Sequence, residues 1–148
     1  MDLKILAILV EDARTPYTEI GKRLFVSSGT IHVRMAKMEE LGIIQRHQLI
    51  VNYDKLGFDI TAFLGIFLTR SALYEITVER LEEIDEIISL HYTTGSYSMF
   101  VQIVCKDTNH LRDVLDKIQS IEGIHRTETL ISLEESINRP LGILVKEE

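Results

Sequence analysis

The 148-residue sequence is poor in the residues that mark secreted and membrane proteins. It has no tryptophan, two prolines and a single cysteine, so no disulfide can form within the chain. That cysteine, Cys105, ends an apolar run, where a buried and inert thiol is expected. The longest apolar runs, such as Ile5 to Val10, are far shorter than the roughly 20 residues of a bilayer span. Without a signal-peptide pattern at the start, we expect a cytoplasmic protein with no membrane partner.

The sequence also lacks the side-chain patterns of catalytic and metal sites. It has no serine–histidine–aspartate arrangement, Walker loop, HExxH motif or pair of cysteines. The five histidines are scattered, and no two lie at the spacing of metal ligands. The acids from Glu79 to Glu86 recur at helical spacing, which is typical of a solvated helix face. We therefore predict no catalytic residue, no metal and no cofactor.

Acidic residues outnumber basic ones, but the charges are unevenly distributed. The formal net charge is −7. Residues 1–57 carry eight basic and seven acidic side chains, a net charge of +1, whereas residues 58–148 carry eight and sixteen, a net charge of −8. From Arg14 to Lys37, five basic residues stand against Glu19 alone, and the segment Val26–Met38 has no acid. This local cationic surface on an acidic chain indicates an anionic partner.

The first part of the chain shows the pattern of three helices. One is predicted over residues 2–12, and a second begins after Thr15, which is expected to cap it. The third is capped by Ser27 or Ser28 and runs to about Leu41. Its predicted buried side repeats at helical spacing in Ile31, Met35 and Met38.

These three helices form a tri-helical helix-turn-helix pattern. The small residue Gly21 lies where the crossing helices are expected to approach closely. The apolar pair at residues 43–44 and the apolar triplet at residues 49–51 predict two short strands, which would form a wing.

The outward side of the third helix is small, polar and basic, and such a helix suits the major groove of double-stranded DNA. Gly29 permits close approach, and Val33 offers a methyl surface to thymine. Hydroxyl, imidazole and basic side chains can donate to bases and phosphates. A merely solvated face is the alternative. The predicted DNA-binding residues are Arg14, Lys22, Ser28, Gly29, Thr30, His32, Val33, Arg34 and Lys37.

From residue 59 the pattern changes to strands alternating with helices. The predicted order is strand 60–69, helix 73–87, strand 88–94, strand 98–106, helix 107–121 and strand 124–133. This β-α-β-β-α-β order is that of a ferredoxin-like fold. We predict an α+β protein with a winged helix-turn-helix domain at residues 1–52, a linker at 53–59 and a ferredoxin-like effector-binding and oligomerisation domain at 60–148.

The predicted strands contain more apolar residues than a single helix-covered sheet face can bury. They include Phe63, Leu64, Ile66, Phe67, Phe100, Val101, Ile103 and Val104. Because two helices cover only one face, the other is expected to be buried against a second chain. A twofold dimer would also double the DNA contacts and match a pseudo-palindromic site.

The segment Tyr92–Ser98 joins two predicted strands and contains Gly95, which can adopt a positive φ. Free amides and hydroxyls in such a turn could receive a carboxylate. The residues alone favour the simpler interpretation of a tight hairpin.

Three segments resemble the leucine-responsive/asparagine-responsive (Lrp/AsnC) family of transcriptional regulators. They are SSGTIHVRMAKMEELGII at 27–44, YTTGSYS at 92–98 and TETLISL at 127–133. The resemblance spans about residues 2–134 and is strongest toward asparagine-responsive members. It implies a DNA-binding regulator rather than an enzyme, built from homodimers that assemble into an octamer. It also implies an amino-acid effector, most simply asparagine, bound between dimers.

The resemblance implies effector-binding roles for Thr94, Gly95, Tyr97, Ser98, Thr127 and Thr129. For the two strand threonines, plain β-propensity is the alternative. Ser98 replaces the aspartate of many relatives, which favours asparagine, and Phe25 replaces their usual glycine. In a left-handed conformation Phe25 would cost about 1 kcal/mol relative to glycine. An amino-acid-binding regulatory protein without a role on DNA and a ferredoxin-like enzyme are the alternative functions.

Overall fold

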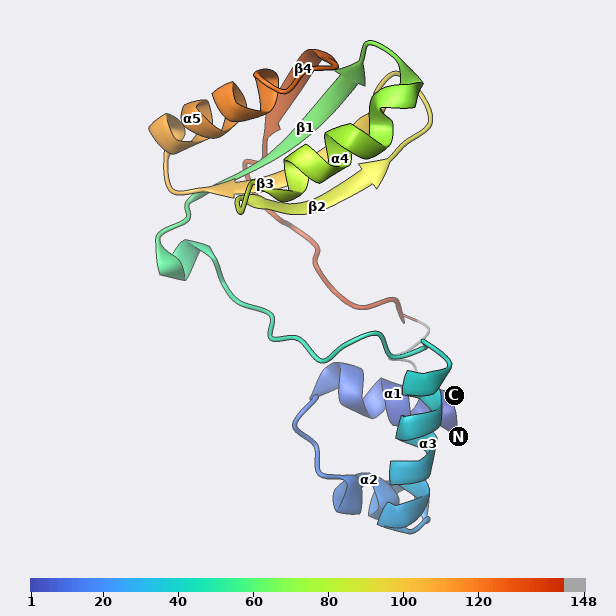
Figure 1. Cartoon of the computed structure of the whole chain (residues 1–148). Coiled ribbons are helices and arrows are strands. Elements are labelled where there is room, and N and C mark those ends of the chain that lie inside the picture. Colours follow the sequence, from blue (N-terminus) through green and yellow to red (C-terminus); the bar gives the residue numbers. More distant parts are fainter. Residues whose placement is uncertain (143–148) are drawn as a thin grey trace. The chain divides into compact units, whose positions relative to one another are not determined.

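A computed structural model describes residues 1–142 of the chain, which form two compact units (Figure 1). The helical unit comprises residues 1–50, together with the described tail from Ser136 to Gly142. The sheet unit comprises Val51–Glu135. The predicted limits 1–52, 53–59 and 60–148 stay a prediction, and residues 143–148 lie outside the described residues. Among the described helices, none combines the length and apolar composition of a membrane span.

The helical unit contains the three predicted helices. They are α1 (Asp2–Glu11), α2 (Tyr17–Leu24) and α3 (Ser28–Glu40). Their core consists of six buried residues, Ile5, Ile8, Ile20, Ile31, Met35 and Met38. All three residues predicted for the inward side of α3 are in this core, so the helical spacing correctly identified which side of α3 is outward.

The N-terminal caps of α2 and α3 differ from each other. Ser27 caps α3, because its Oγ accepts a hydrogen bond from the amide of Thr30 at 3.1 Å. The prediction that Thr15 caps α2 is wrong. Pro16 holds the capping position with an extended backbone, and the Thr15 hydroxyl instead donates to the carbonyl of Asp12 at 2.8 Å.

The turn between α2 and α3 is tightly packed. A Cβ on Gly21 would lie 2.7 Å from the carbonyl oxygen of Val26, so only glycine fits without moving the backbone. This confirms a close approach at Gly21, although the contact is with the turn itself. Phe25 adopts the left-handed conformation at φ 55° and is 96% exposed. The expected cost relative to glycine, about 1 kcal/mol, therefore applies.

The predicted wing does not form in the described structure. Residues 43–44 and 49–51 belong to no strand, and the four strands of residues 1–142 all lie in the sheet unit. Leu49 and Ile50 are 85% and 94% exposed. An isolated two-stranded ribbon without a covering layer is marginally stable in water, which explains why β-propensity alone misled here.

The sheet unit has the predicted β-α-β-β-α-β order. Its main elements are β1 (Ile60–Leu68), α4 (Tyr74–Glu82), β2 (Ile87–Tyr92), β3 (Met99–Cys105), α5 (Thr108–Gln119) and β4 (Ile124–Ile131). Short 3₁₀ turns at Asp54–Leu56 and Ser71–Leu73 precede β1 and α4. The strands are antiparallel in the order β2-β3-β1-β4, and α4 and α5 lie on the same side of the sheet (Figure 1). This confirms the ferredoxin-like fold.

Helix α4 is shorter than predicted. It ends at Glu82, whereas the apolar spacing suggested a helix to residue 87. A turn at Asp85 and Glu86 leads into β2, and the carbonyl of Glu86 already accepts a hydrogen bond from the amide of Val104 in β3. Ile84 is nevertheless buried in the same core as Leu81, so the burial pattern continues beyond the helix.

The two sheet faces carry different apolar residues. The helix-covered face buries Ala62, Leu64, Ile66, Met99, Val101, Ile103 and Cys105. Burial raises the pKa of the Cys105 thiol to about 11, in agreement with the prediction of an inert cysteine. On the other face, which we call the open face, Phe63, Phe67 and Phe100 alternate with these residues and are only partly buried.

Tyr97 joins these three residues to form an aromatic cluster on the open face. Phe63 and Phe100 stack with ring centroids 5.8 Å apart, and Phe67 meets Tyr97 edge-on at 5.2 Å. The Tyr97 ring covers Gly65, where a Cβ would overlap the ring. Helices α4 and α5 leave this cluster uncovered, because both lie on the opposite side of the sheet.

Candidate DNA interface and effector site

The outward side of α3 borders a groove of about 570 Å³, which we call the α3 groove. It is lined by Asp2, Gly29, Thr30, Val33, Arg34 and Lys37. Val33 is 71% exposed on this side of the helix. An exposed methyl surface between polar donors is the arrangement that contacts thymine and neighbouring bases in a major groove.

Hydrogen bonds fix two of the polar side chains at the α3 groove. The Thr30 hydroxyl lies 2.9 Å from Ser27 Oγ. Arg34 Nη1 donates to Asp2 Oδ1 at 2.7 Å, which links α3 to the start of α1. Asp2 is not among the predicted DNA-binding residues, because nothing in the sequence indicates a contact between residues 32 positions apart.

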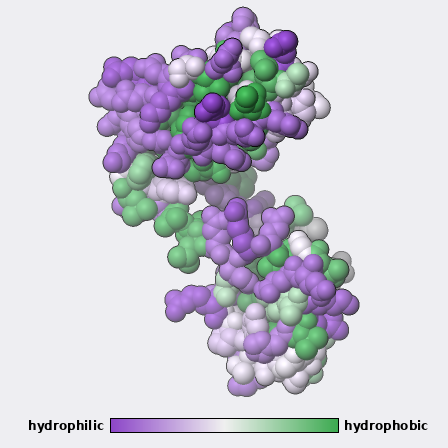
Figure 2. Space-filling model, viewed as in Figure 1, coloured by the Kyte–Doolittle hydropathy of each residue, from purple (hydrophilic) through white to green (hydrophobic). Residues whose placement is uncertain are grey.

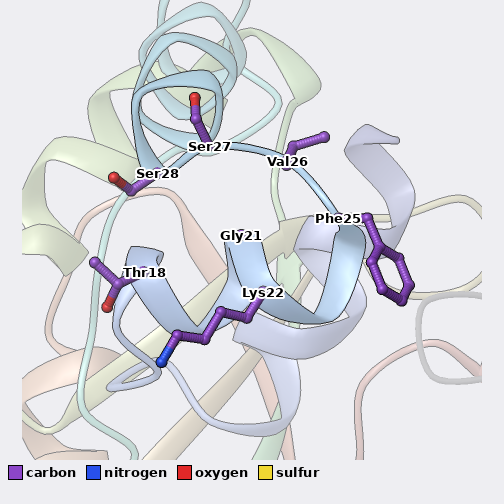
Figure 3. A pocket seen from close by; sticks show the side chains of 7 residues that line it. All are labelled: Thr18, Gly21, Lys22, Phe25, Val26, Ser27 and Ser28. Atoms are coloured by element: carbon purple, nitrogen blue, oxygen red, sulfur yellow. The ribbon is translucent and has the colours of Figure 1, made fainter.

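A second hollow, of about 520 Å³, lies between α2 and the start of α3 (Figure 3). Its lining residues are Thr18, Gly21, Lys22, Phe25, Val26, Ser27 and Ser28. Figure 3 shows Lys22 extending along α2 toward Thr18, whereas the Phe25 ring lies at the far end of the hollow. An ammonium group and several hydroxyls around one hollow suit a phosphate oxygen.

Two predicted DNA-binding residues lie outside both hollows. His32 is exposed, and its ring meets the Tyr17 ring edge-on at 4.5 Å. Arg14 is exposed in the turn between α1 and α2, where its amide donates to Asp12 Oδ1 at 2.9 Å. The other seven line one hollow or the other, so the structure gathers most of the predicted DNA-binding set on the helical unit.

The turn between β2 and β3 is held by its own backbone and by Thr93. The Thr93 amide donates to the carbonyl of Ser98 at 3.3 Å, and the Thr93 hydroxyl donates to the carbonyl of Tyr97 at 3.0 Å. Thr94 and Gly95 are exposed at the tip, and Gly95 has φ 95°. A Cβ there would meet nothing within 4 Å, so backbone conformation rather than space demands glycine.

Ser98 and Tyr97 connect this turn to the sheet. Ser98 Oγ accepts a hydrogen bond from the amide of Leu68 at 3.2 Å. The Tyr97 hydroxyl donates to Glu128 of β4, which raises the pKa of Tyr97. Next to this pair, the Arg126 guanidinium lies 4.3 Å from the Phe67 ring centroid. The open face therefore combines an apolar centre with charged side chains on β4.

The two predicted effector threonines lie on the other side of β4. Thr127 pairs with Ile66 and Thr129 with Leu64, and directly paired side chains share a sheet face, here the helix-covered one. The Gln119 amide of α5 donates to Thr127 Oγ1 at 2.9 Å, beside a hollow of about 280 Å³. Within one chain, the six predicted effector residues are thus divided between two faces. The sequence gives no indication that Gln119 contacts Thr127.

No three histidine, cysteine, aspartate or glutamate side chains within residues 1–142 are close enough together to hold a metal ion. Hydrophilic side chains cover much of the face of the sheet unit that is in view in Figure 2. Helix α4, which carries Glu75, Glu79 and Glu82, contributes acidic side chains to the surface of the sheet unit.

Comparisons with known proteins agree with this architecture. Residues 1–39 match the AsnC-type helix-turn-helix domain, and residues 61–141 match the Lrp/AsnC ligand binding domain. The chain is 45% identical to the regulatory protein AsnC of Haemophilus influenzae over 95% of both chains. It is 42% identical to AsnC of Escherichia coli K12, over 95% of this chain and 93% of the relative.

Solved structures show the same fold. The structure of E. coli AsnC superimposes with a TM-score of 0.89 at 41% identity and covers 95% of both chains. A transcriptional regulator of Neisseria meningitidis, solved in complex with L-methionine, gives a TM-score of 0.87 at 22% identity. It covers 93% of this chain and 91% of its own.

A helix-turn-helix unit joined to a ligand-binding α+β unit defines a DNA-binding transcriptional regulator of the amino-acid-responsive type, and its relatives are named regulators rather than enzymes. More specifically, the chain belongs to the Lrp/AsnC family.

Proposed function

We propose that this protein binds double-stranded DNA through α2 and α3 and changes its DNA binding when asparagine occupies the sheet unit. The exposed, polar and basic side of α3 around the α3 groove is the observation that carries the DNA-binding part. Identity of 45% to a regulator named AsnC is what favours asparagine over other amino acids. Because a regulator must share a compartment with its DNA, a cytoplasmic location accompanies the proposal.

The DNA contacts fall into two groups in this proposal. Gly29, Thr30 and Val33 face base edges, because they are the small and polar residues of the first half of α3. Arg34 lies beside these residues on the α3 groove. The others hold the phosphate backbone or border it, and they are Arg14, Lys22, Ser28, His32 and Lys37. Phosphate contacts of this kind make binding strongly salt-dependent, with a log–log slope of roughly −0.9 per phosphate.

The effector site is proposed to form between chains. Its predicted residues are Thr94, Gly95, Tyr97, Ser98, Thr127 and Thr129. The division of these residues between two sheet faces supports this, since no single face of one chain can present all six. The exposed turn tip at Gly95 would supply amides to the carboxylate of asparagine. The threonines would come from β4 of a neighbouring chain.

The open face is proposed to form the homodimer, and dimers to assemble into an octamer. The partly buried aromatic cluster supports the dimer, because stacked aromatic side chains without a covering layer are typical of an interface core. Asparagine bound between dimers would then bias the assembly, and hence the way in which DNA half-sites are engaged.

A thermal-shift screen of the purified chain with all common amino acids tests the effector. Asparagine is expected to raise the melting temperature most, because a ligand that binds only the native state stabilises it. Gly95→Val should abolish the shift while DNA binding persists. Gly57→Val is the matched control, since Gly57 also has a positive φ of 85° and open space around its Cβ position.

The three outcomes of the experiment are distinct. A shift that is lost only in Gly95→Val supports the proposed site. Equal asparagine dissociation constants for the parent and Gly95→Val by calorimetry would remove the turn from the site. No shift with asparagine, together with a shift for another amino acid, would replace the effector and leave the DNA-binding proposal intact.

A further inference from the structure

The strongest contact at the α3 groove joins two oppositely charged residues from different helices. Arg34 Nη1 lies 2.7 Å from Asp2 Oδ1, and the two side chains are 40% and 45% exposed. Unlike the Arg23–Glu19 and His47–Glu39 pairs of the same unit, this pair joins residues that lie far apart in the sequence. Because both side chains are well exposed, the pair adds little to folding stability.

The position of the pair matters more than its stability. Asp2 and Arg34 both line the α3 groove, beside Gly29, Thr30 and Val33. Asp2 therefore places a carboxylate on a surface that is otherwise suited to an anionic partner. A carboxylate there opposes unspecific attraction of phosphates, so it weakens DNA binding in general.

The carboxylate also fixes the arginine. A guanidinium has five N–H donors in a rigid plane, and the bond from Nη1 to Asp2 favours one orientation of the remaining donors. An arginine on a flexible stem can follow any phosphate, whereas a held arginine can bind only where an acceptor meets its plane. N–H donors of Arg34 that are held in one orientation discriminate between DNA sites, because a DNA sequence without an acceptor at the right position leaves these donors unpaired.

We propose that Asp2 is a positioning residue for DNA recognition, which holds Arg34 as a fixed donor for one position of each half-site and prevents it from acting as a mobile phosphate contact. Asp2 thereby reduces affinity for unrelated DNA and increases the ratio of specific to unspecific binding. The inference rests on the proposed contact of α3 with DNA.

The test compares the parent with Asp2→Asn on two duplexes of equal length. One is selected from a random library by the parent protein, and the other has the same base composition in scrambled order. Affinities are measured by fluorescence anisotropy between 50 and 200 mM salt. Glu40→Gln is the matched control, because it removes one negative charge from the exposed far end of α3.

For Asp2→Asn we expect the ratio of specific to scrambled affinity to fall by up to about fivefold, because an exposed ion pair holds its arginine only weakly. On the scrambled duplex, the released Arg34 should steepen the log–log salt slope by about 0.9 per protomer, or roughly threefold more loss of affinity between 50 and 200 mM. Glu40→Gln should keep both the ratio and the slope of the parent.

A double-mutant cycle with Arg34→Ala separates this role from general electrostatics. If Asp2 acts through Arg34, Asp2→Asn changes nothing further in the Arg34→Ala background. Equal ratios and slopes for Asp2→Asn and the parent, with a native melting temperature, would overturn the role of Asp2. Unchanged DNA binding in Arg34→Ala would instead remove Arg34 from the proposed interface.

Discussion

The helical unit and the sheet unit reach stability in different ways. The helical unit closes three helices over six buried residues, whereas the sheet unit packs two helices on a sheet with twelve. The outward surface of the smaller unit stays open around the α3 groove, and the larger unit leaves its aromatic cluster open. Each unit thus combines a closed core with one surface that the rest of the same unit leaves uncovered.

The two units also use glycine differently. Gly21 in α2 packs against a backbone carbonyl, which cannot move without displacing α3. Gly65 in β1 packs against the Tyr97 ring, a side chain that can rotate away. We therefore expect the helical unit to be the more sensitive of the two to an added side chain.

The largest expected effect is that of Gly21→Val. The new side chain would overlap the Val26 carbonyl, and we expect a loss of about 3 kcal/mol in unfolding free energy, at the upper end for overpacking. Urea unfolding measures it. Gly29→Ala is the control within the same unit, because its Cβ would meet only Ser27 Oγ at 3.6 Å. Gly29→Ala should be neutral or stabilising. Equal stability of Gly21→Val and the parent would show that the turn is not rigid.

Loss of the α3 cap comes next. Ser27→Ala removes the acceptor for the Thr30 amide, and we expect a cost of about 1 kcal/mol. Ser28→Ala, one residue along, keeps the cap and should leave the melting temperature unchanged. A comparison of both variants by thermal unfolding tests whether the cap contributes to stability. The same loss from both would mean that the cap hydrogen bond is unimportant.

Phe25→Gly is expected to stabilise the helical unit by up to about 1 kcal/mol, because glycine relieves the left-handed strain and little buried area is lost. Phe25→Ala separates strain from the ring, since it removes the ring and keeps the strain. Only the glycine variant should melt at a higher temperature. A gain in the alanine variant of the same size would identify the exposed ring, rather than the backbone, as the cause.

The smallest effect concerns pH and the sheet unit. His110 Nε2 lies 2.8 Å from Glu86 Oε1, and their hydrogen bond is the main cause of a lowered Glu86 pKa. The unfolded chain therefore takes up the proton first as pH falls. The stabilisation is present above the usual pKa of 4.5 and is lost as pH decreases through the folded-state value.

His110→Ala should flatten this part of the stability profile, measured by urea unfolding from pH 3 to pH 6. Arg80→Ala is the control, because it breaks an exposed pair with Glu83 in the same unit. Its profile should match that of the parent. Parallel profiles for His110→Ala and the parent would contradict the role of the Glu86–His110 pair.

Much of the fold could be predicted from the sequence, because periodic burial determines it. Ile31, Met35 and Met38 correctly defined the inward side of α3, and the order of elements correctly gave the ferredoxin-like sheet. The wing failed because local β-propensity at residues 49–51 has no covering layer in the structure. Intrinsic β-propensity describes the local preference of a segment, whereas packing against neighbouring elements determines whether a strand forms.

The candidate sites were less accessible from the sequence. The outward side of α3 follows from helical geometry, so most predicted DNA-binding residues lie together. The Asp2–Arg34 pair and the Gln119–Thr127 hydrogen bond join residues from separate elements, and sequence spacing carries no signal for such contacts. For the same reason, the sequence did not reveal that Tyr97 and Thr127 lie on opposite faces of the sheet.

The most direct test of the account measures the affinity of the parent and Arg34→Ala for one selected duplex at matched salt, with assembly followed by sedimentation. The account predicts weaker binding by the variant with an unchanged sedimentation coefficient, because Arg34 lies on the proposed DNA-binding side of α3 in the helical unit and not in the sheet unit. Equal affinities would contradict it.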